Sequence, residues 1–315
     1  MIGKLDRVAV EIPRGSSLRQ IADILKQKGA LQNETLFVLL GKITDKQTRL
    51  QAGYFWVPKG LHPWQLLNYL TRPEAATVRV TIPEGKTLEF YASVFSQKLG
   101  TDSSRFMQLV TDSSFCKQLG VQAATLEGYL LPETYFLPKH MDEESIIKYL
   151  VQQTEKIFQA DTVLLQLKKL NMTVHQILTL ASIIEGEAMV DSERVVISSV
   201  YHNRLRKGWH LRADPTIQYI LPGKPRRLLF KHLEIDSPYN TYLYKGLPPG
   251  PINNPGKRSI LAALFPAQTD YLYFVARGDG GHYFSRTGRE HAKYKAMFDE
   301  VRRKVRLQQK MKKQK

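Results

Sequence analysis

The sequence predicts an α+β protein: a small N-terminal α+β module, followed by a mostly helical domain that contains a short β-hairpin. Three observations support this class. A strand-turn-helix pattern occurs twice near the N-terminus, segments with helical periodicity follow from about residue 103, and an alternating pattern near residues 271–285 indicates a hairpin. Because domains usually hold roughly 100–200 residues, 315 residues suggest two of them. We expect residues 1–100 and 101–300 to form these domains, with 301–315 as a tail.

The repeat places Val10-Glu-Ile-Pro-Arg-Gly-Ser-Ser-Leu beside a second copy, Val80-Thr-Ile-Pro-Glu-Gly-Lys-Thr-Leu. Each copy predicts a strand, a Pro-x-Gly turn and a hydroxyl residue that caps an amphipathic helix. Ser17 and Thr87 are the expected caps, and Gly29 is the expected end of the first helix. The copies predict two units of one small module, although two unrelated capping sequences would look the same.

The remaining elements follow from local periodicity and turn residues. Between the two copies, residues 50–57 indicate a strand with a glycine break, and residues 63–70 indicate a short helix. Longer helices are expected at Ser104–Leu109, Glu143–Gln159, Val174–Glu187 and Ser192–Lys207.

Residues 208–258 are rich in Pro, Gly, Asn and Tyr, and such a long loop-rich stretch in a compact domain is usually functional. A hairpin over Tyr271–Ser285 and a final helix from Gly288 to about Lys304 complete the prediction.

The chain is strongly basic, with a formal net charge of +17 and an isoelectric point near 9.8. Such a chain favours polyanions: nucleic acid, an anionic lipid surface or an acidic wall polymer. Residues 301–315 contain eight Lys or Arg and no acid, so the other 300 residues carry only +9. Nearly half of the excess therefore belongs to a basic C-terminal tail, which is expected to be a solvated helix end or a lipid- or wall-binding segment.

Several classes of protein do not fit the composition. A single cysteine, Cys116, allows no intrachain disulfide and no Cys-rich zinc module. The chain has no HExxH, GxGxxG or GxxxxGK[ST] motif, so we expect neither a metal nor a cofactor. The longest apolar run, Ile177–Ile184, is far shorter than the roughly 20 residues that span a bilayer. The first residues have no signal-peptide core.

The best candidate for chemistry is the end of the predicted helix Val174–Glu187. A nearly all-apolar helix is expected to be buried, and it delivers Glu185 directly after two isoleucines. Lost hydration would raise the pKa of that carboxyl, which favours the neutral form that a general acid needs. Gly186 leaves room for a close ligand, and Glu187 projects about 200° further round the helix. The alternative is that this Glu-Gly-Glu sequence only ends a core helix and is solvated.

Further motifs occur in a fixed order along the chain: Leu126-Glu-Gly-Tyr, Pro132-Glu-Thr-Tyr, Leu180-Ala-Ser-Ile-Ile-Glu-Gly-Glu, Ser192-Glu-Arg, Asn203-Arg-Leu, Ala213-Asp-Pro-Thr, Tyr239-Asn-Thr-Tyr, Gly246-Leu-Pro-Pro-Gly-Pro-Ile and Leu272-Tyr-Phe-Val with Gly281-His. In this order they resemble one known family, the YceG-like endolytic murein (peptidoglycan) lytic transglycosylases. The resemblance covers roughly residues 8–300.

The resemblance implies cleavage of the MurNAc–β-1,4–GlcNAc bond within glycan strands, which leaves 1,6-anhydro-MurNAc ends and terminates strand growth. The catalytic glutamate of the family falls on Glu185, which acts first as acid and then as base, with no metal and no cofactor. The N-terminal module is then LysM-like. The family also suggests murein synthases (penicillin-binding proteins) as partners.

Other residues are candidates for substrate contacts. Aromatic rings and amide groups suit sugars, and on this basis Tyr201, Tyr239, Asn240 and Asn254 are expected to contact the glycan. Glu127 is expected either to line the cleft or, with a slight preference, to be the buried partner of an arginine such as Arg204.

Two further residues are expected to be structural. Asp214 in Asp-Pro-Thr fits a helix cap, and His282 fits a structural role in the hairpin.

Members of this family usually begin with a cytoplasmic segment and one transmembrane helix, which are absent from this sequence. We nevertheless expect a location at the inner membrane, facing the periplasm, because murein lies outside the cytoplasm.

Three alternatives remain open at this point: a non-catalytic peptidoglycan-binding module, an ordinary glycoside hydrolase with a second carboxylate, and a nucleic-acid-binding protein. No recognition helix or RNA-binding motif supports the last of these.

Overall fold

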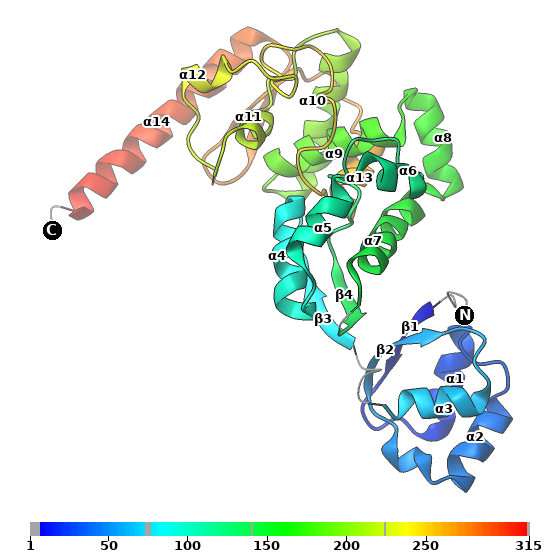
Figure 1. The fold of residues 1–315 in the computed structure, drawn as a ribbon. Helices are drawn as coiled ribbons and strands as arrows, with labels where there is room; N and C mark the ends of the chain where they lie inside the picture. The colour runs from blue at the N-terminus through cyan, green and yellow to red at the C-terminus, as the bar shows by residue number, and fades with distance from the viewer. Residues whose placement is uncertain (1–6, 73–76, 140, 224, 314–315) are drawn as a thin grey trace. The chain divides into compact units, whose positions relative to one another are not determined.

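The computed structural model describes residues 7–72, 77–139, 141–223 and 225–313, with side chains as far as residue 303 (Figure 1). The chain forms two compact units, each assembled from three segments. The first unit contains residues 1–82, 89–108 and 133–146, and the second contains residues 83–88, 109–132 and 147–315. Helices and small antiparallel sheets occur together, so the predicted α+β class is confirmed.

The first unit begins with strand β1 (Arg7–Ile12), which pairs antiparallel with β2 (Gly53–Pro58). Three helices and a short 3-10 helix accompany this pair: α1 (Leu18–Gln27), α2 (Glu34–Ile43), η1 (Lys46–Arg49) and α3 (Pro63–Leu70). The core between them consists of apolar side chains such as Val10, Leu25, Phe37, Phe55 and Leu66.

A second strand pair, β3 (Thr77–Thr81) with β4 (Thr134–Pro138), also belongs to this unit. The helices α4 (Leu88–Leu99) and α5 (Ser103–Val110) follow β3 along the chain.

The repeat is visible in the backbone. Each copy forms a strand, a turn and a helix, and the turn glycines, Gly15 and Gly85, have φ angles of +80° and +72°. These are left-handed conformations that glycine adopts without a steric cost. Ser17 caps α1 as predicted, because its hydroxyl accepts a hydrogen bond from the backbone N–H of Gln20. Gly29, with φ at +69°, follows the end of α1, as expected for a helix stop.

The second unit is mostly helical. Its elements are α6 (Ser113–Gln118), α7 (Glu143–Phe158), α8 (Asp161–Leu170), α9 (Val174–Glu187), η3 (Asp191–Glu193), α10 (Arg194–Arg206), α11 (Asp214–Ile220), α12 (Phe230–Leu233), α13 (Lys257–Leu264), β5 (Tyr273–Ala276), β6 (His282–Ser285) and α14 (Gly288–Lys313). Of these, α7 begins in the first unit and continues into the second. Strands β5 and β6 form the predicted hairpin.

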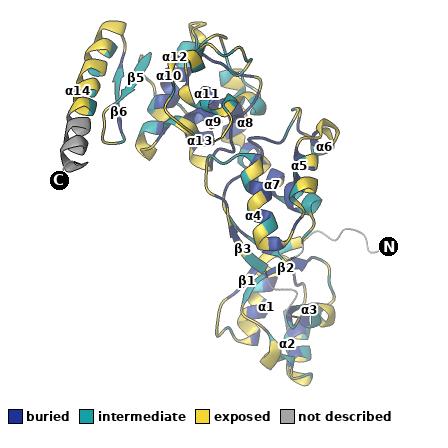
Figure 2. Ribbon diagram, turned by 60° about the vertical axis from the view of Figure 1, so that its left-hand side comes forward, coloured by how far each residue is buried: buried dark blue, intermediate teal, exposed yellow. Residues whose placement is uncertain are grey.

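Helix α9 is the centre of this unit. All eight residues from Ile177 to Ile184 are buried, and α9 packs against α10, α11 and α13 (Figure 2). Its bounds coincide with the predicted ones, because Thr173 forms a capping box with Gln176 at one end. The apolar pattern on every face of α9 thus corresponds to a helix surrounded by protein.

Some expectations differ from the structure. The helices α2, α8 and α13 were not predicted, and the loop-rich stretch 208–258 contains the short helices α11 and α12. Helix α14 continues to Lys313 and does not end near Lys304, since its last turns contain neither glycine nor proline. Among the described residues, no helix combines the length and the apolar character that a membrane span requires.

Candidate active site

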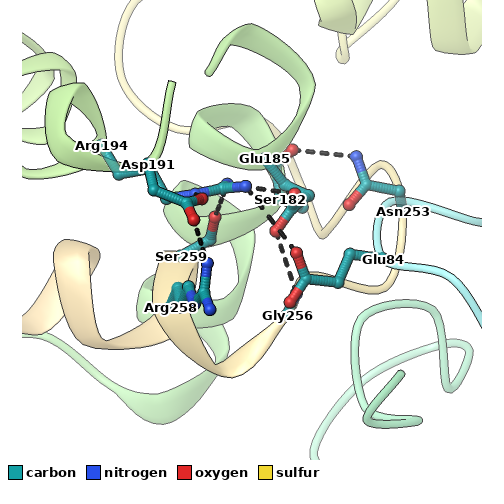
Figure 3. Close-up of polar contacts among 9 residues, drawn as sticks. All are labelled: Glu84, Ser182, Glu185, Asp191, Arg194, Asn253, Gly256, Arg258 and Ser259. Atoms are coloured by element: carbon teal, nitrogen blue, oxygen red, sulfur yellow. Dashed lines mark hydrogen bonds and ion pairs between the residues drawn. The ribbon is translucent and has the colours of Figure 1, made fainter. Parts of the chain in front are cut away.

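Glu185 stands in the last turn of α9, and its side chain is only 6% exposed. Its burial follows from the preceding apolar turns of α9, as the sequence predicted. The carboxylate nevertheless has polar partners. Oε1 accepts a hydrogen bond from Nη1 of Arg194 at 3.0 Å, and Oε2 accepts one from the backbone N–H of Gly256 at 3.0 Å (Figure 3). The loss of hydration expected for Glu185 is therefore accompanied by polar contacts that the sequence did not indicate, because Arg194 reaches the carboxylate from α10.

Arg194 connects the polar groups around Glu185. Its side chain is 9% exposed, and Nη1 also donates to Oγ of the buried Ser259 on α13. Nε donates to Oδ1 of Asp191 at 3.0 Å, which fixes the guanidinium plane from the other side. Asp191 in turn forms an ion pair with Arg258 (Figure 3). The guanidinium is thus held in one orientation, with its charge directed at Glu185.

A second carboxyl group, that of Glu84, lies beside the same arginine. Oε2 of Glu84 is 3.7 Å from Nη2 of Arg194. Burial raises the pKa of Glu84, and the negative charge of Glu185 raises it further, while Arg194 lowers it. Two carboxyl groups therefore share one buried guanidinium, and the environment of Glu84 raises its pKa and favours its neutral form.

Two glycines, Gly85 and Gly256, lie next to the carboxyl groups of Glu84 and Glu185. A Cβ atom on Gly256 would lie 2.0 Å from Oε1 of Glu84, and one on Gly85 would lie 3.4 Å from Cγ of Glu185. Gly85 also has a φ of +72°, so a side chain there would be strained in addition. The backbone at Gly256 therefore approaches Glu84 more closely than a residue with a side chain would allow, whereas a Cβ atom on Gly85 would make only an ordinary van der Waals contact with Glu185.

The loop that carries Gly256 is fixed to α9 by Ser182. The hydroxyl of Ser182 accepts a hydrogen bond from the backbone N–H of Ile252 at 3.0 Å. The side chain of Asn253 donates to the carbonyl oxygen of Ser182 at 2.9 Å (Figure 3). These bonds join the loop to the turn that precedes Glu185, so the N–H of Gly256 is positioned by the same helix that positions the carboxylate.

Two of the predicted residues, Glu127 and Asn254, lie in contact with each other. The amide of Asn254 donates to Oε1 of Glu127 at 2.7 Å and to the carbonyl oxygen of Lys86. Its oxygen accepts from the backbone N–H groups of Gly128 and Leu130. Asn254 is fully buried, so all of its bonds serve to hold three chain segments together. The expected partner of Glu127 was an arginine such as Arg204, but Arg204 donates instead to carbonyl oxygens of Leu272 and Leu211.

The other predicted contacts differ in their exposure. Asn240 is fully buried and donates to the carbonyl oxygens of Leu233 and Ile235, so it braces its own loop. Tyr201 is also fully buried, and its hydroxyl donates to Glu187 at 2.9 Å. A direct contact with substrate does not fit either side chain. Tyr239 is partly exposed and remains available for such a contact.

Glu187 faces a different region from Glu185, as the helical geometry predicted. It lines a cavity of about 950 Å³ together with residues of α10, α11, α14 and the hairpin. Burial raises the pKa of Glu187 to about 7, partly offset by the hydrogen bond from Tyr201.

Asp214 and His282 line the same cavity. Asp214 is the first residue of α11 and not its cap, since Ala213 precedes the helix, and its carboxylate accepts a hydrogen bond from the hydroxyl of Tyr242. Nδ1 of His282 lies 2.7 Å from Glu193, so that histidine contributes to the fold of the hairpin.

Sequence reasoning missed Glu84 and the role of Arg194. Glu84 stands in the second copy of the repeat at the position that Arg14 occupies in the first copy, and this charge reversal was a usable signal. Arg194 stands within the Ser192-Glu-Arg motif, but no local pattern shows that it turns toward Glu185. In the part of the chain that the structure describes, no group of three or more His, Cys, Asp or Glu side chains could hold a metal ion.

Comparison with known proteins identifies the family. The model of the YceG-like family matches residues 10–297. The chain belongs to the YceG-like family. A relative from Bacillus subtilis (strain 168), an endolytic murein transglycosylase, is 36% identical over 307 residues, which are 92% of this chain and 84% of that protein. A protein of the same name from Streptococcus pneumoniae strain D39 is 29% identical, and the match covers 90% of this chain and 57% of that protein.

A solved structure also resembles this fold. The 2.6 Å crystal structure of a YceG-like protein from Listeria monocytogenes has a TM-score of 0.63 and 35% sequence identity, and the match covers 91% of this chain and 98% of that chain.

Proposed function

We propose that this YceG-like protein is an endolytic peptidoglycan lytic transglycosylase, with Glu185 as its single catalytic acid and base. The observation that carries the proposal is the buried carboxyl group of Glu185, which is held by Arg194 and by the N–H of Gly256. The names of the relatives from Bacillus subtilis and Streptococcus pneumoniae support the same activity.

In the first step, protonated Glu185 donates its proton to the oxygen of the glycosidic bond between MurNAc and GlcNAc. The bond from that oxygen to C1 of MurNAc breaks, and GlcNAc leaves with a free 4-hydroxyl group. Glu185 becomes a carboxylate, and Arg194 at 3.0 Å stabilises the new charge in a buried site where water contributes little. The neighbouring carboxyl of Glu84, whose pKa is raised by burial, helps to keep a proton in the site before this step.

In the second step, the C6 hydroxyl of MurNAc attacks C1 of the same sugar. The carboxylate of Glu185 accepts the proton of that hydroxyl as the new bond from O6 to C1 forms, and the acid is regenerated. The product is a 1,6-anhydro sugar. Because the nucleophile belongs to the substrate, this reaction requires neither a second catalytic carboxylate nor an activated water.

We assign the surrounding residues according to their exposure. Tyr239 is proposed to contact the glycan directly, since its ring is accessible. Glu127 and Asn254 are proposed to position the loop that carries Gly256. Asn240 is proposed to hold its own loop, and Tyr201 to hold the carboxyl group of Glu187.

Digestion of purified murein followed by mass spectrometry tests the proposal. The parent protein is expected to release muropeptides with 1,6-anhydro ends from within strands. Glu185→Gln should lose at least about 10²-fold in rate, and Glu133→Gln, an exposed carboxyl outside the site, should digest as the parent does. Absence of anhydro products from the parent, or full activity of Glu185→Gln, would overturn the assignment.

One observation favours a second candidate, a glycoside hydrolase. Glu84 supplies the second carboxyl group that hydrolysis requires, and it lies beside the same arginine as Glu185. The mass spectrum separates the two reactions, because a hydrolase leaves reducing ends that are heavier by one water. A non-catalytic peptidoglycan-binding protein would release neither product.

The remaining assignments rest on the resemblance to the family. We propose that the protein acts at the cell wall, on nascent strands, near the murein synthases. The division into a LysM-like module over residues 1–100, a catalytic domain over 101–300 and a basic tail over 301–315 stays a prediction.

A further inference from the structure

The cavity that Glu187 lines has no role in the reaction proposed at Glu185. Its volume of about 950 Å³ lies at the upper end of the range of ligand pockets. It belongs entirely to the second unit, where α9, α10, α11, α14 and the β5–β6 hairpin surround it. Its lining combines acidic, basic and aromatic side chains.

The inner polar groups of the cavity are already bonded within the protein. Glu187 accepts a hydrogen bond from Tyr201 at 2.9 Å, and Asp214 accepts one from Tyr242 at 2.5 Å. Nε of Arg204 donates to the carbonyl oxygen of Leu272 at 2.7 Å. These groups shape the cavity, and each already has a hydrogen-bond partner within the protein.

Three basic residues of the lining, here called the outer cations, differ from the inner groups because their side chains have no partner among the described residues. Arg212, Lys245 and Lys295 are exposed and line the cavity, and their side chains form no hydrogen bond or ion pair within the part of the chain that the structure describes. Arg212 also has a φ of +48°, a left-handed conformation that costs free energy in a residue with a side chain. That backbone strain places a guanidinium at the cavity, and strain of this kind concentrates at functional sites.

Aromatic rings complete the cavity. Trp209, which is 39% exposed, packs edge-on against Tyr273 with ring centroids 6.0 Å apart. Aliphatic carbon chains bind such rings through their apolar surface, while carboxylates pair with arginine and lysine. The cavity therefore suits a ligand that has short aliphatic segments and carboxylate groups.

We propose that this cavity binds the carboxylate-bearing peptide that is attached to the glycan strand, while the glycan itself lies at Glu185. The inference rests on the proposed function, since it takes murein as the substrate. It adds that Arg212, Lys245 and Lys295 determine a preference for strands whose peptides carry free carboxylates.

The two sites are close enough for one substrate to reach both. Glu185 and Glu187 are two residues apart on α9, and a helix with its side chains is about 10–12 Å wide. An extended peptide spans about 3.3–3.6 Å per residue, so three or four residues cover that width. Between the two glutamates the ring of Pro215 packs against Gly186, where a Cβ atom would lie 2.6 Å from it, so a bound peptide would pass around Pro215.

Binding measurements with two matched probes test the inference. The first is a tetrasaccharide of alternating GlcNAc and MurNAc that carries tetrapeptides with free carboxylates. The second is the same compound after its peptide carboxylates have been converted to amides. With Glu185→Gln, which should not cleave either probe, the free-carboxylate form is expected to bind about 10-fold more tightly in calorimetry at low salt.

Variants of the outer cations test whether these side chains cause the preference for free carboxylates. The double variant Lys245→Gln with Lys295→Gln is expected to remove most of the preference for free carboxylates. Lys293→Gln, an exposed lysine of α14 that does not line the cavity, should keep it. Equal affinity of the parent background for both probes, or an equal loss of preference in Lys293→Gln, would overturn the inference.

The outcome is separable from that of the proposed function. If anhydro products form from both probes at the same rate, the transglycosylase assignment stands and the inference about the cavity fails. If no anhydro product forms but the preference for free carboxylates persists, the cavity assignment stands and the catalytic one fails. Should Glu185→Gln prove unfolded, the ratio of cleavage rates of the two probes by the parent gives the same comparison.

Discussion

Arg194 Nη1 lies 3.0 Å from Oε1 of Glu185, and both side chains are less than 10% exposed. A buried ion pair gains stability only where further hydrogen bonds satisfy both partners, and here Ser259, Asp191 and the N–H of Gly256 do so. The ion pair is therefore better explained by its effect on the charge of Glu185 than by a contribution to the stability of the fold.

Arg194→Lys tests that role. Lysine keeps the charge but cannot form the planar set of bonds that Arg194 makes to Glu185, Ser259 and Asp191, so the carboxylate formed in the first step would be less well stabilised. We expect a loss of about 10²-fold in the rate of anhydro-product formation. Arg258→Lys, which changes an exposed arginine bonded to the same Asp191, should retain most of the activity. Comparable losses in both variants would contradict the assigned role.

Glu84→Gln tests whether two carboxyl groups share the proton. Glutamine keeps the shape of Glu84 but can neither hold the shared proton nor carry the negative charge that Glu84 gains when the pair loses that proton, so the site should lose its proton more readily. The pH above which the rate falls is therefore expected to move to lower values, with a smaller loss of maximal rate than in Glu185→Gln. A pH–rate series on purified murein measures both. An unshifted alkaline limb would mean that Glu84 does not influence the proton that reacts.

Asn254→Ala tests whether the hydrogen bonds of Asn254 hold Glu127 and the loop before α13 together. The substitution removes four hydrogen bonds from a fully buried position: two from its amide nitrogen and two to its oxygen. Since polar groups left buried without a partner each cost about 1–3 kcal/mol, we expect a loss of about 3 kcal/mol in the free energy of unfolding. Urea denaturation measures it, and Gln122→Ala, an exposed amide, should stay within about 0.5 kcal/mol of the parent.

Local signals in the sequence predicted the elements that depend on local chemistry. Ser17 has a cap pattern that the structure confirms, and the bounds of α9 follow from its apolar period and from Thr173. The burial of Glu185 was predictable because it ends a helix whose preceding turns are apolar, but the groups that contact its carboxylate, Arg194 and Gly256, come from other segments.

Long-range contacts were not predictable in this way. Glu84 and Glu185 are about a hundred residues apart, and nothing in either segment shows that Arg194 joins them. For the same reason Asn254 was predicted as a substrate contact, whereas its bonds to Glu127 give it a structural role. Polar residues in loops indicate where function lies, but their exposure decides whether they bind substrate or hold the loop.

Glu187→Gln tests the buried carboxyl of the cavity through the pH dependence of stability. Burial raises the pKa of Glu187 to about 7 in the folded protein, above the model-compound value of 4.5. The folded state thus keeps a proton that the unfolded state releases between about pH 4.5 and 7. Over this range the parent should lose stability as pH rises, and above pH 7 the loss should level off.

Glutamine carries no ionisable proton, so the variant should lack this decline. The difference in the free energy of unfolding between parent and variant is expected to change by up to about 3 kcal/mol from pH 4.5 to 8. Urea denaturation across that range measures it, with Glu133→Gln as an exposed control whose curve should run parallel to that of the parent. A parallel curve for Glu187→Gln would show that Glu187 is ionised in the folded protein throughout, and that Tyr201 and Arg204 compensate its charge fully.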